Sequence, residues 1–263
     1  MIPNDDAPIL EFDADSAPIL NPQSQPVINE PLPARGVLCF FQEVIDRLIA
    51  DNKLIKIGWK RSEMGPQPIY KLEQDGQPVF VMHPGVGAPL AAGFLEELIA
   101  NGARGVLACG GCGVLSKEIA AGHAVILTSA VRDEGTSYHY LPPSREVASS
   151  ELAVTALVQT LSDHGVPFIL GKSWTTDGLY RETEAKRARR MAEGCVVVEM
   201  EAAAFFAVAQ HREVQFGQVV YGGDLVVPEG WDRRSWDKRL DVREELFWLT
   251  VEAAARMPLD PPV

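Results

Sequence analysis

The chain has 263 residues, of which 46% are hydrophobic and 23% charged, with a formal net charge of −12. This length allows one large or two modest domains with a sizeable core. The acidic balance argues against sequence-independent nucleic-acid binding, which needs Lys and Arg on phosphates. No run approaches the roughly 18–20 apolar residues of a membrane span, no secretory signal pattern opens the chain, and four cysteines are too few for a disulfide scaffold. We therefore expect a cytoplasmic protein without a nucleic-acid or membrane partner.

The first 33 residues differ in composition from the rest of the chain. They hold six acidic residues, seven of the 19 prolines and neither Lys nor Arg. Such a segment buries too little apolar surface to offset its ordering entropy. We therefore expect an N-terminal arm over residues 1–33, mobile or loosely draped, followed by a single domain over residues 34–263.

After the arm, predicted strands alternate with predicted helices. Strands are expected over residues 36–41, 54–59, 69–73, 78–82, 105–109, 124–129, 167–173, 195–199 and 217–221. Helices are expected over residues 42–51, 89–101, 147–164, 182–193, 202–212 and 243–257. Asp75-Gly76 predicts a hairpin turn, because both residues tolerate positive φ. The alternation predicts an α/β domain with helices on both faces of its sheet.

Ligands in open α/β sheets bind beyond the carboxyl ends of strands, so the segments that follow strands are the candidates for a site. Residues 85–89 read Gly-Val-Gly-Ala-Pro directly before a helix, where backbone amides and the helix N-terminus favour an anion. A second glycine-rich segment occupies residues 110–113. Tight turns or close packing are the alternative for both. Cys109 and Cys112 have no second ligand pair nearby, so no metal site is expected.

Three carboxylates follow two further predicted strands. Glu199 and Glu201 bracket Met200, and their burial is costly unless they meet donors such as sugar hydroxyls. Attraction to a helix N-terminus would explain one of these two acids but not both. Asp224 follows Gly222-Gly223 after a buried strand, either as an acid of the site or as a simple cap.

The order of these segments resembles the nucleoside phosphorylase family, which includes uridine phosphorylases, hexameric purine nucleoside phosphorylases and methylthioadenosine nucleosidases. The resemblance covers about residues 54–257. It rests on the glycine-rich segments, on Val-Arg-Asp-Glu-Gly-Thr-Ser at 131–137, and above all on Val-Glu-Met-Glu-Ala-Ala at 198–203. It implies a three-layer α/β/α sandwich around a central mixed, partly barrel-like sheet. It also implies a homodimer or a higher homo-oligomer.

The resemblance implies a role for each carboxylate. Glu201 would bind the ribose hydroxyls, Met200 would pack beneath the sugar, and Glu199 would lie near the ribose and base. Asp224 would be the general acid that protonates the leaving base. The chemistry requires such an acid, because an oxocarbenium-like transition state forms as the base leaves and an anionic nucleophile approaches. The implied reaction is phosphorolysis of a nucleoside in salvage, with inorganic phosphate as co-substrate and no other cofactor.

The phosphate end departs from the family pattern. Gly87 and Gly111 fall at this end, but the family's phosphate arginine is replaced by Ala108 and its Gly-Asp-Pro motif is absent. Arg61 (by its spacing) and Arg132 (by its chemistry) are candidate phosphate ligands, and a solvated or structural arginine is the alternative for both. A hydrolytic nucleosidase with the same site and a catalytically weak nucleoside-binding homologue therefore stay open beside the phosphorylase.

The base end departs as well. Leu179, Tyr180 and Gly110 are expected at the base, where Tyr180 would stack on it or else belong to the core or rim. Thr183 and Ala185 stand where uridine phosphorylases carry the glutamine and arginine that read uracil. The sequence therefore does not predict the base.

Overall fold

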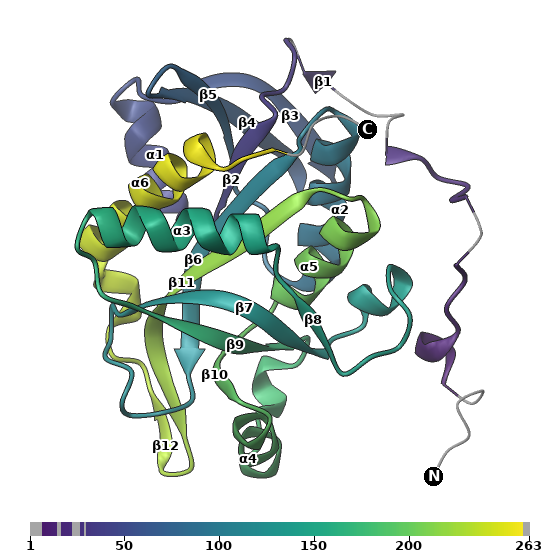
Figure 1. Cartoon of the computed structure of the whole chain (residues 1–263), viewed down its shortest axis with the longest axis vertical. Helices are drawn as coiled ribbons and strands as arrows, with labels where there is room; N and C mark the ends of the chain where they lie inside the picture. The colour runs from purple at the N-terminus through teal and green to yellow at the C-terminus, as the bar shows by residue number, and fades with distance from the viewer. Residues whose placement is uncertain (1–6, 15–16, 23–26, 29, 260–263) are drawn as a thin grey trace.

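The computed structural model describes residues 7–14, 17–22, 27–28 and 30–259. Its centre is a twelve-stranded sheet in the order β1-β3-β4-β5-β2-β6-β10-β9-β7-β11-β12, with β8 paired to β7 (Figure 1). The strands are β1 (Val27–Ile28), β2 (Arg35–Cys39), β3 (Ile55–Ser62), β4 (Gly65–Gln74), β5 (Gln77–Met82), β6 (Gly105–Val114), β7 (Ala124–Asp133), β8 (Glu146–Ala148), β9 (Phe168–Thr176), β10 (Cys195–Glu199), β11 (Gln215–Val227) and β12 (Gly230–Asp232). The helices are α1 (Gln42–Ala50), α2 (Ala88–Ala100), α3 (Glu151–Asp163), α4 (Glu184–Ala192), α5 (Ala202–His211) and α6 (Leu240–Arg256).

Helices cover both faces of the sheet. Helices α1, α3 and α6 bury one apolar cluster against it, and α2 and α5 bury the other (Figure 1). Burial of this much aliphatic and aromatic surface is the main stabilising contribution. The observed layers confirm the expected α/β/α class.

Strand β6 joins two parts of the sheet. It pairs in parallel with β2 and β11 and antiparallel with β10. Because β10, β9, β7 and β11 are paired in succession, the strands β6-β10-β9-β7-β11 close into a ring. The sheet is therefore mixed, as expected. Glycine permits the close approach at Gly113, where a Cβ would lie 2.9 Å from Val198.

Several predicted elements have different bounds in the structure, and two of them show why. The strand expected at 217–221 continues as β11 to Val227, because β12 folds back and pairs with it. Asp224 therefore lies inside β11, at a shift of register between Gly222 and Leu225, and not beyond a strand end. The helix expected from residue 147 begins at Glu151, where the Ser150 side chain caps α3 by accepting a hydrogen bond from the Ala153 amide.

The last part of the expected arm packs against the domain. β1 pairs antiparallel with β3, Glu30 forms an ion pair with Lys71 at 2.7 Å, and Leu32 is buried in the core. The domain therefore begins before the expected boundary at residue 34. Residues 1–6, 15–16, 23–26 and 29 of the arm lie outside the described residues. In the described part of the chain, no helix has the length and apolar character needed to cross a membrane.

Candidate active site

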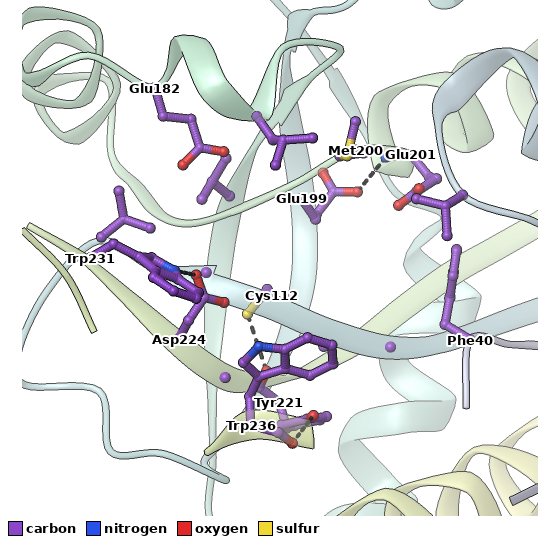
Figure 2. Close-up of a pocket in the computed structure, with 18 of the residues that line it drawn as sticks. Phe40, Cys112, Glu182, Glu199, Met200, Glu201, Tyr221, Asp224, Trp231 and Trp236 are labelled. Carbon is purple, nitrogen blue, oxygen red and sulfur yellow. Dashed lines mark hydrogen bonds between the residues drawn. The ribbon is translucent and has the colours of Figure 1, made fainter. Parts of the chain in front are cut away.

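A cavity of about 880 Å³ opens where β6, β10 and β11 meet the segment before α4 and the β11–β12 hairpin (Figure 2). Most of the residues that the sequence singled out line it, namely Gly110, Gly111, Leu179, Tyr180, Glu199, Met200, Glu201 and Asp224. Gly87, Arg61 and Arg132 are not among its lining residues. The fold thus gathers residues from four separate segments at one place.

Glu199 ends β10 with both carboxylate oxygens bonded inside the protein. Oε1 accepts hydrogen bonds from the hydroxyls of Ser173 and Thr175, at 2.8 and 2.6 Å. Oε2 accepts from the amides of Glu201 and Ala202 at the start of α5, at 2.7 and 2.6 Å. Burial raises the pKa of Glu199, and these four donors oppose that shift. Glu199 is therefore the acid that the helix N-terminus stabilises.

Glu201 is the carboxylate left for a ligand. Its side chain lines the cavity, and Oε1 accepts a hydrogen bond from the Gly87 amide at 2.6 Å. Burial, and then the charge of Glu199, raise the pKa of Glu201 to about 8. A buried carboxyl group bonded at one oxygen can form further hydrogen bonds to a ligand, both when it is charged and when it is protonated. Met200 lies beside it in the same wall (Figure 2).

The Gly87 loop supports Glu201. Gly85 and Gly87 adopt φ values of +76° and +95°, which favour glycine. This conformation turns the Gly87 amide toward Glu201 at the start of α2. The amide that was expected to bind an anion is therefore already bonded to a carboxylate.

The opposite end of the cavity is formed by Asp224, Trp231 and Glu182 (Figure 2). Asp224 is half-buried and accepts a hydrogen bond from the indole nitrogen of Trp231 at 2.6 Å. Glu182 follows the short 3₁₀ turn Leu179–Arg181 and its carboxyl enters the cavity (Figure 2). Burial and the charge of Asp224 raise the pKa of Glu182 to about 7. These three residues form the end of the cavity farthest from Glu201.

The residues expected at the base occupy different depths. The Tyr180 side chain is 92% exposed, so Tyr180 belongs to the rim of the cavity and not to the core. Leu179 is beside it on the same turn and is also exposed. Gly110 lies deep in β6, where a Cβ would come 3.1 Å from the Phe40 ring.

The two arginines expected at the phosphate lie apart from the cavity. Arg132 is buried, and its guanidinium donates hydrogen bonds to Ser137, Leu141, Pro142 and Ser144. Arg132 is therefore a structural arginine that holds the loop after β7, the alternative that the sequence left open. Arg61 is exposed on the β3–β4 hairpin and does not line the cavity.

The wall beyond Glu201 is aromatic, with one buried cation. Phe40 and Phe41 precede α1, and Arg243 from α6 lies over the Phe41 ring at 4.8 Å. Arg243 forms an ion pair with Glu43 at 2.6 Å. Its charge also acts on the phenol of Tyr221, whose ring would lie 3.4 Å from a Cβ at Gly111. Arg243 thus lies near the glycine that was expected at the phosphate.

Sequence reasoning missed Glu182, Trp231, Phe40 and Arg243. Glu182 had a usable signal, because it is an acid two residues after Tyr180 in the stretch expected at the base. The others lay in segments without a recognised motif. In the described part of the chain, no three His, Cys, Asp or Glu side chains are arranged to hold a metal ion.

The site thus lies on a mixed sheet between two helical layers, at the place where the glycine-rich segments and the carboxylates come together. A sequence profile of the phosphorylase superfamily matches residues 34–247. The chain therefore belongs to the phosphorylase superfamily.

Two curated relatives are similar over much of the chain. The guanosine phosphorylase of Halorubrum lacusprofundi is 30% identical over 159 residues, which cover 60% of this chain and 66% of that protein. The uridine phosphorylase of Escherichia coli is 26% identical over 202 residues, which cover 72% of this chain and 79% of that protein. The chain therefore spans just under two thirds of the length of the first of these relatives.

Solved structures share the fold. The purine nucleoside phosphorylase of Toxoplasma gondii, solved with immucillin-H, has a TM-score of 0.75 at 20% identity and covers 86% of this chain and 92% of its own. The AMP nucleosidase of Bacteroides thetaiotaomicron has a TM-score of 0.68 at 21% identity and covers 84% and 87%. At these identities the likeness establishes the fold alone.

Proposed function

We propose that this protein cleaves the N-glycosidic bond of a nucleoside by phosphorolysis, releasing the free base and a pentose 1-phosphate. The observation that carries the proposal is the single cavity with Glu201 at one end and Asp224 at the other. A nucleoside needs hydroxyl acceptors at its sugar and a carboxyl group at its base, and this cavity offers both.

The sugar would lie against Glu201 and Met200. The Glu201 carboxylate would accept hydrogen bonds from the ribose hydroxyls, while the Gly87 amide keeps it in place. Glu199 supports this arrangement from behind by fixing the start of α5. At the other end, Asp224 faces the base, as the resemblance requires of it. The base would stack against the aromatic rim formed by Tyr180 and Trp231.

Phosphate as the nucleophile is supported by Arg243. A dianion needs charge-assisted partners, and Arg243 is a lining cation close to Tyr221 and Gly111. Its partner Glu43 has a side chain 38% exposed, so an incoming phosphate could displace it. Arg61 of a neighbouring subunit would be a second anchor in a homo-oligomer.

Water as the nucleophile is the second candidate. Among the described residues that line the cavity, the cations are Arg187 and Arg243. Both already have partners. Arg187 donates a hydrogen bond to the Val226 carbonyl at 2.8 Å, and Arg243 forms an ion pair with Glu43. A site that keeps these bonds would admit a neutral nucleophile more readily than a dianion.

One product analysis separates the candidates. Purine and pyrimidine nucleosides are incubated with the protein with and without inorganic phosphate, and the sugar product is identified. Phosphorolysis predicts a pentose 1-phosphate that forms only when phosphate is present, whereas hydrolysis predicts the free pentose in both conditions. Binding without turnover would indicate the catalytically weak homologue and would contradict the proposal.

The phosphate anchor has its own test. Arg243→Met should raise the KM for phosphate about tenfold or more while the nucleoside Kd stays near that of the wild type. An unchanged KM for phosphate would remove Arg243 from the proposal. A cytoplasmic location and a homo-oligomer are parts of the same proposal, and light scattering of the purified protein would test the second.

A further inference from the structure

Gln218 is a buried side-chain amide in the wall of the cavity. It lies in β11, is 1% exposed, and lines the same cavity as Glu201 and Asp224. Within the part of the chain that the structure describes, its Oε1 has no hydrogen-bond partner. An unpaired buried acceptor is costly. A ligand that donates a hydrogen bond to this oxygen would remove that cost.

The neighbours of Gln218 on the sheet are apolar. Phe216 and Val220, which share its face of β11, are buried in the apolar core. Gln218 also pairs with Ala108 of β6 on one side and with Leu127 of β7 on the other. None of these four side chains can donate a hydrogen bond. These neighbours therefore leave the amide to a group in the cavity.

Small residues leave room beside the amide. Gly110 lies two residues after Ala108 on the same face of β6, and it lines the cavity together with Phe40. The face of β6 next to Gln218 therefore carries no side chain longer than a methyl group at these two positions. Ala108 also stands where the resemblance places an arginine of the phosphate site. Gln218 is its register partner and brings a polar group to the same level of the sheet.

The position of Gln218 along β11 suits the approach of a nucleophile. Six residues separate it from Asp224, which is at most about 20 Å at roughly 3.3 Å per residue. A nucleophile that displaces the base directly attacks the sugar from the face opposite the leaving group. With the base toward Asp224, as proposed above, that face is turned toward the Gln218 end of the strand.

We propose that Gln218 binds the nucleophile through an O–H group, which donates a hydrogen bond to its Oε1. The inference rests on the proposed cleavage of a nucleoside. Hydrogen phosphate and water both carry an O–H at neutral pH, whereas sulfate carries none. An arginine only donates and cannot sense this proton, but a side-chain amide can accept as well as donate. Gln218 therefore selects the nucleophile by the proton that it carries.

The reaction at this site balances in atoms and charge. The bond between the anomeric carbon and the base nitrogen breaks, its electron pair stays on the base, and an oxygen of the nucleophile bonds to the anomeric carbon. The O–H that donates to Gln218 stays on the nucleophile during the attack, and Gln218 neither gains nor loses a proton. Overall, water or hydrogen phosphate loses one proton and the base takes up one.

The test compares the wild type with Gln218→Met, which keeps the length of the side chain but removes its hydrogen-bonding groups. Its kcat/KM should fall about ten- to a hundredfold, with a similar rise in the KM for phosphate if phosphate is the nucleophile. The Kd of formycin should stay near that of the wild type. Formycin is a nucleoside whose base and sugar are joined by a carbon–carbon bond, so it reports nucleoside binding without turnover.

A matched control separates the site from the substitution. Gln77 is exposed in β5 and does not line the cavity, so Gln77→Met should retain the wild-type kinetics. Both variants should retain the wild-type Tm. For Gln218→Met the reason is that no described residue is a partner of Oε1, so no hydrogen bond within the described chain is lost at that atom.

Two further measurements identify the nucleophile that Gln218 binds. Gln218→Glu places a carboxylate there, which should repel a phosphate dianion and abolish phosphorolysis, but should accept the proton of water and preserve hydrolysis. If phosphate is the nucleophile, sulfate should compete with it at least about tenfold more weakly than phosphate itself binds, and Gln218→Met should reduce this difference. An equal preference in the two proteins would contradict a bond from an O–H to Oε1.

The outcomes separate this inference from the proposed function. If Gln218→Met forms the pentose 1-phosphate with wild-type kinetics, the inference fails and phosphorolysis stands. If its affinity for formycin falls as much as its kcat/KM, Gln218 holds the nucleoside instead and the inference fails as well. A free pentose formed without phosphate, with a lower kcat in Gln218→Met, keeps the inference and removes phosphorolysis. A wild type that cleaves no nucleoside removes both.

Discussion

The two ends of the cavity are built in different ways. At the proposed sugar end, Glu199 accepts four hydrogen bonds and Glu201 accepts one from the Gly87 amide, so both carboxyl groups are fixed by strands and helix starts. At the base end, Glu182 has no hydrogen-bond partner among the described residues. Asp224 is bonded to Trp231, whose side chain is 63% exposed.

The difference suggests that one end of the cavity is rigid and the other adaptable. Ribonucleosides with different bases share the same ribose hydroxyls, so a rigid acceptor at the proposed sugar end can be preorganised for all of them. The base varies between nucleosides, and the site that receives it is formed by the turn Leu179–Arg181 and the β11–β12 hairpin. Such segments adapt more readily than the strand ends do.

The largest effect should be a loss of stability when a carboxyl group at the proposed sugar end is removed. Glu199→Ala leaves four buried donors without their acceptor, which should lower the free energy of unfolding by about 3–5 kcal/mol and the Tm by roughly 10 °C. Glu182→Ala is the matched control, and it should leave the Tm nearly unchanged because no hydrogen bond is lost. Thermal unfolding of both variants measures the contrast, which would disappear if the two Tm values fell equally.

The pH dependence of stability is the next effect. The pKa of Glu201 is raised from near 4.5 to about 8, so its folding contribution is present below pH 4.5 and is lost as pH rises through 8. Glu201→Gln removes this dependence. Its stability relative to the wild type should improve by on the order of 2–4 kcal/mol between pH 4.5 and 9. Denaturant unfolding at the two pH values measures this, and a pH-independent difference would contradict the burial argument.

The next largest effect should be the loss of substrate recognition when Glu201 is replaced. Glu201→Gln weakens the acceptor that faces the ribose, so kcat/KM for ribosides should fall ten- to a hundredfold, or about 1.5–3 kcal/mol. Binding of 2′,3′-dideoxyribosides, which lack both hydroxyls, should change little. If the variant handled ribosides as the wild type does, Glu201 would not be the sugar acceptor.

The smallest effect should be at Trp231. Trp231→Phe keeps an aromatic ring but removes the N–H that bonds Asp224. Because this residue is exposed, kcat/KM should fall only about three- to tenfold, or roughly 0.6–1.4 kcal/mol, with no change in Tm. Trp231→Ala, which also loses the ring, should bind the base more weakly. A loss of several hundredfold in Trp231→Phe would show that the base end is as rigid as the sugar end.

Most of the fold could be predicted because its elements have clear periodicity. Alternating apolar strands, the Asp75-Gly76 turn and the helices with one apolar face all appear near their expected positions. The strand β12 and the continuation of β11 could not be predicted, since residues 228–232 carry no alternation of their own and are ordered by pairing. The pairing of β1 with β3 could not be predicted either, because β1 lies in an acidic, proline-rich segment without a strand pattern.

The candidate site also has a part that could be predicted from the sequence and a part that could not. The carboxylates of the sugar end could be found from sequence, because burial of Glu199 and Glu201 after three valines demands partners. Which of the two is free for a ligand depends on Ser173 and Thr175 of β9, whose approach only the folded sheet determines. At the proposed base end, Glu182 and Asp224 are 42 residues apart in the numbering, and only the fold brings both to the lining of one cavity.

The most direct test of the central claim is a crystal structure of the Asp224→Asn variant with a bound purine ribonucleoside. The account predicts ribose hydroxyls within about 3 Å of the Glu201 carboxylate, and a base that lies between Glu182, residue 224 and Trp231. A nucleoside bound with its base toward Glu201, or bound outside this cavity, would contradict it.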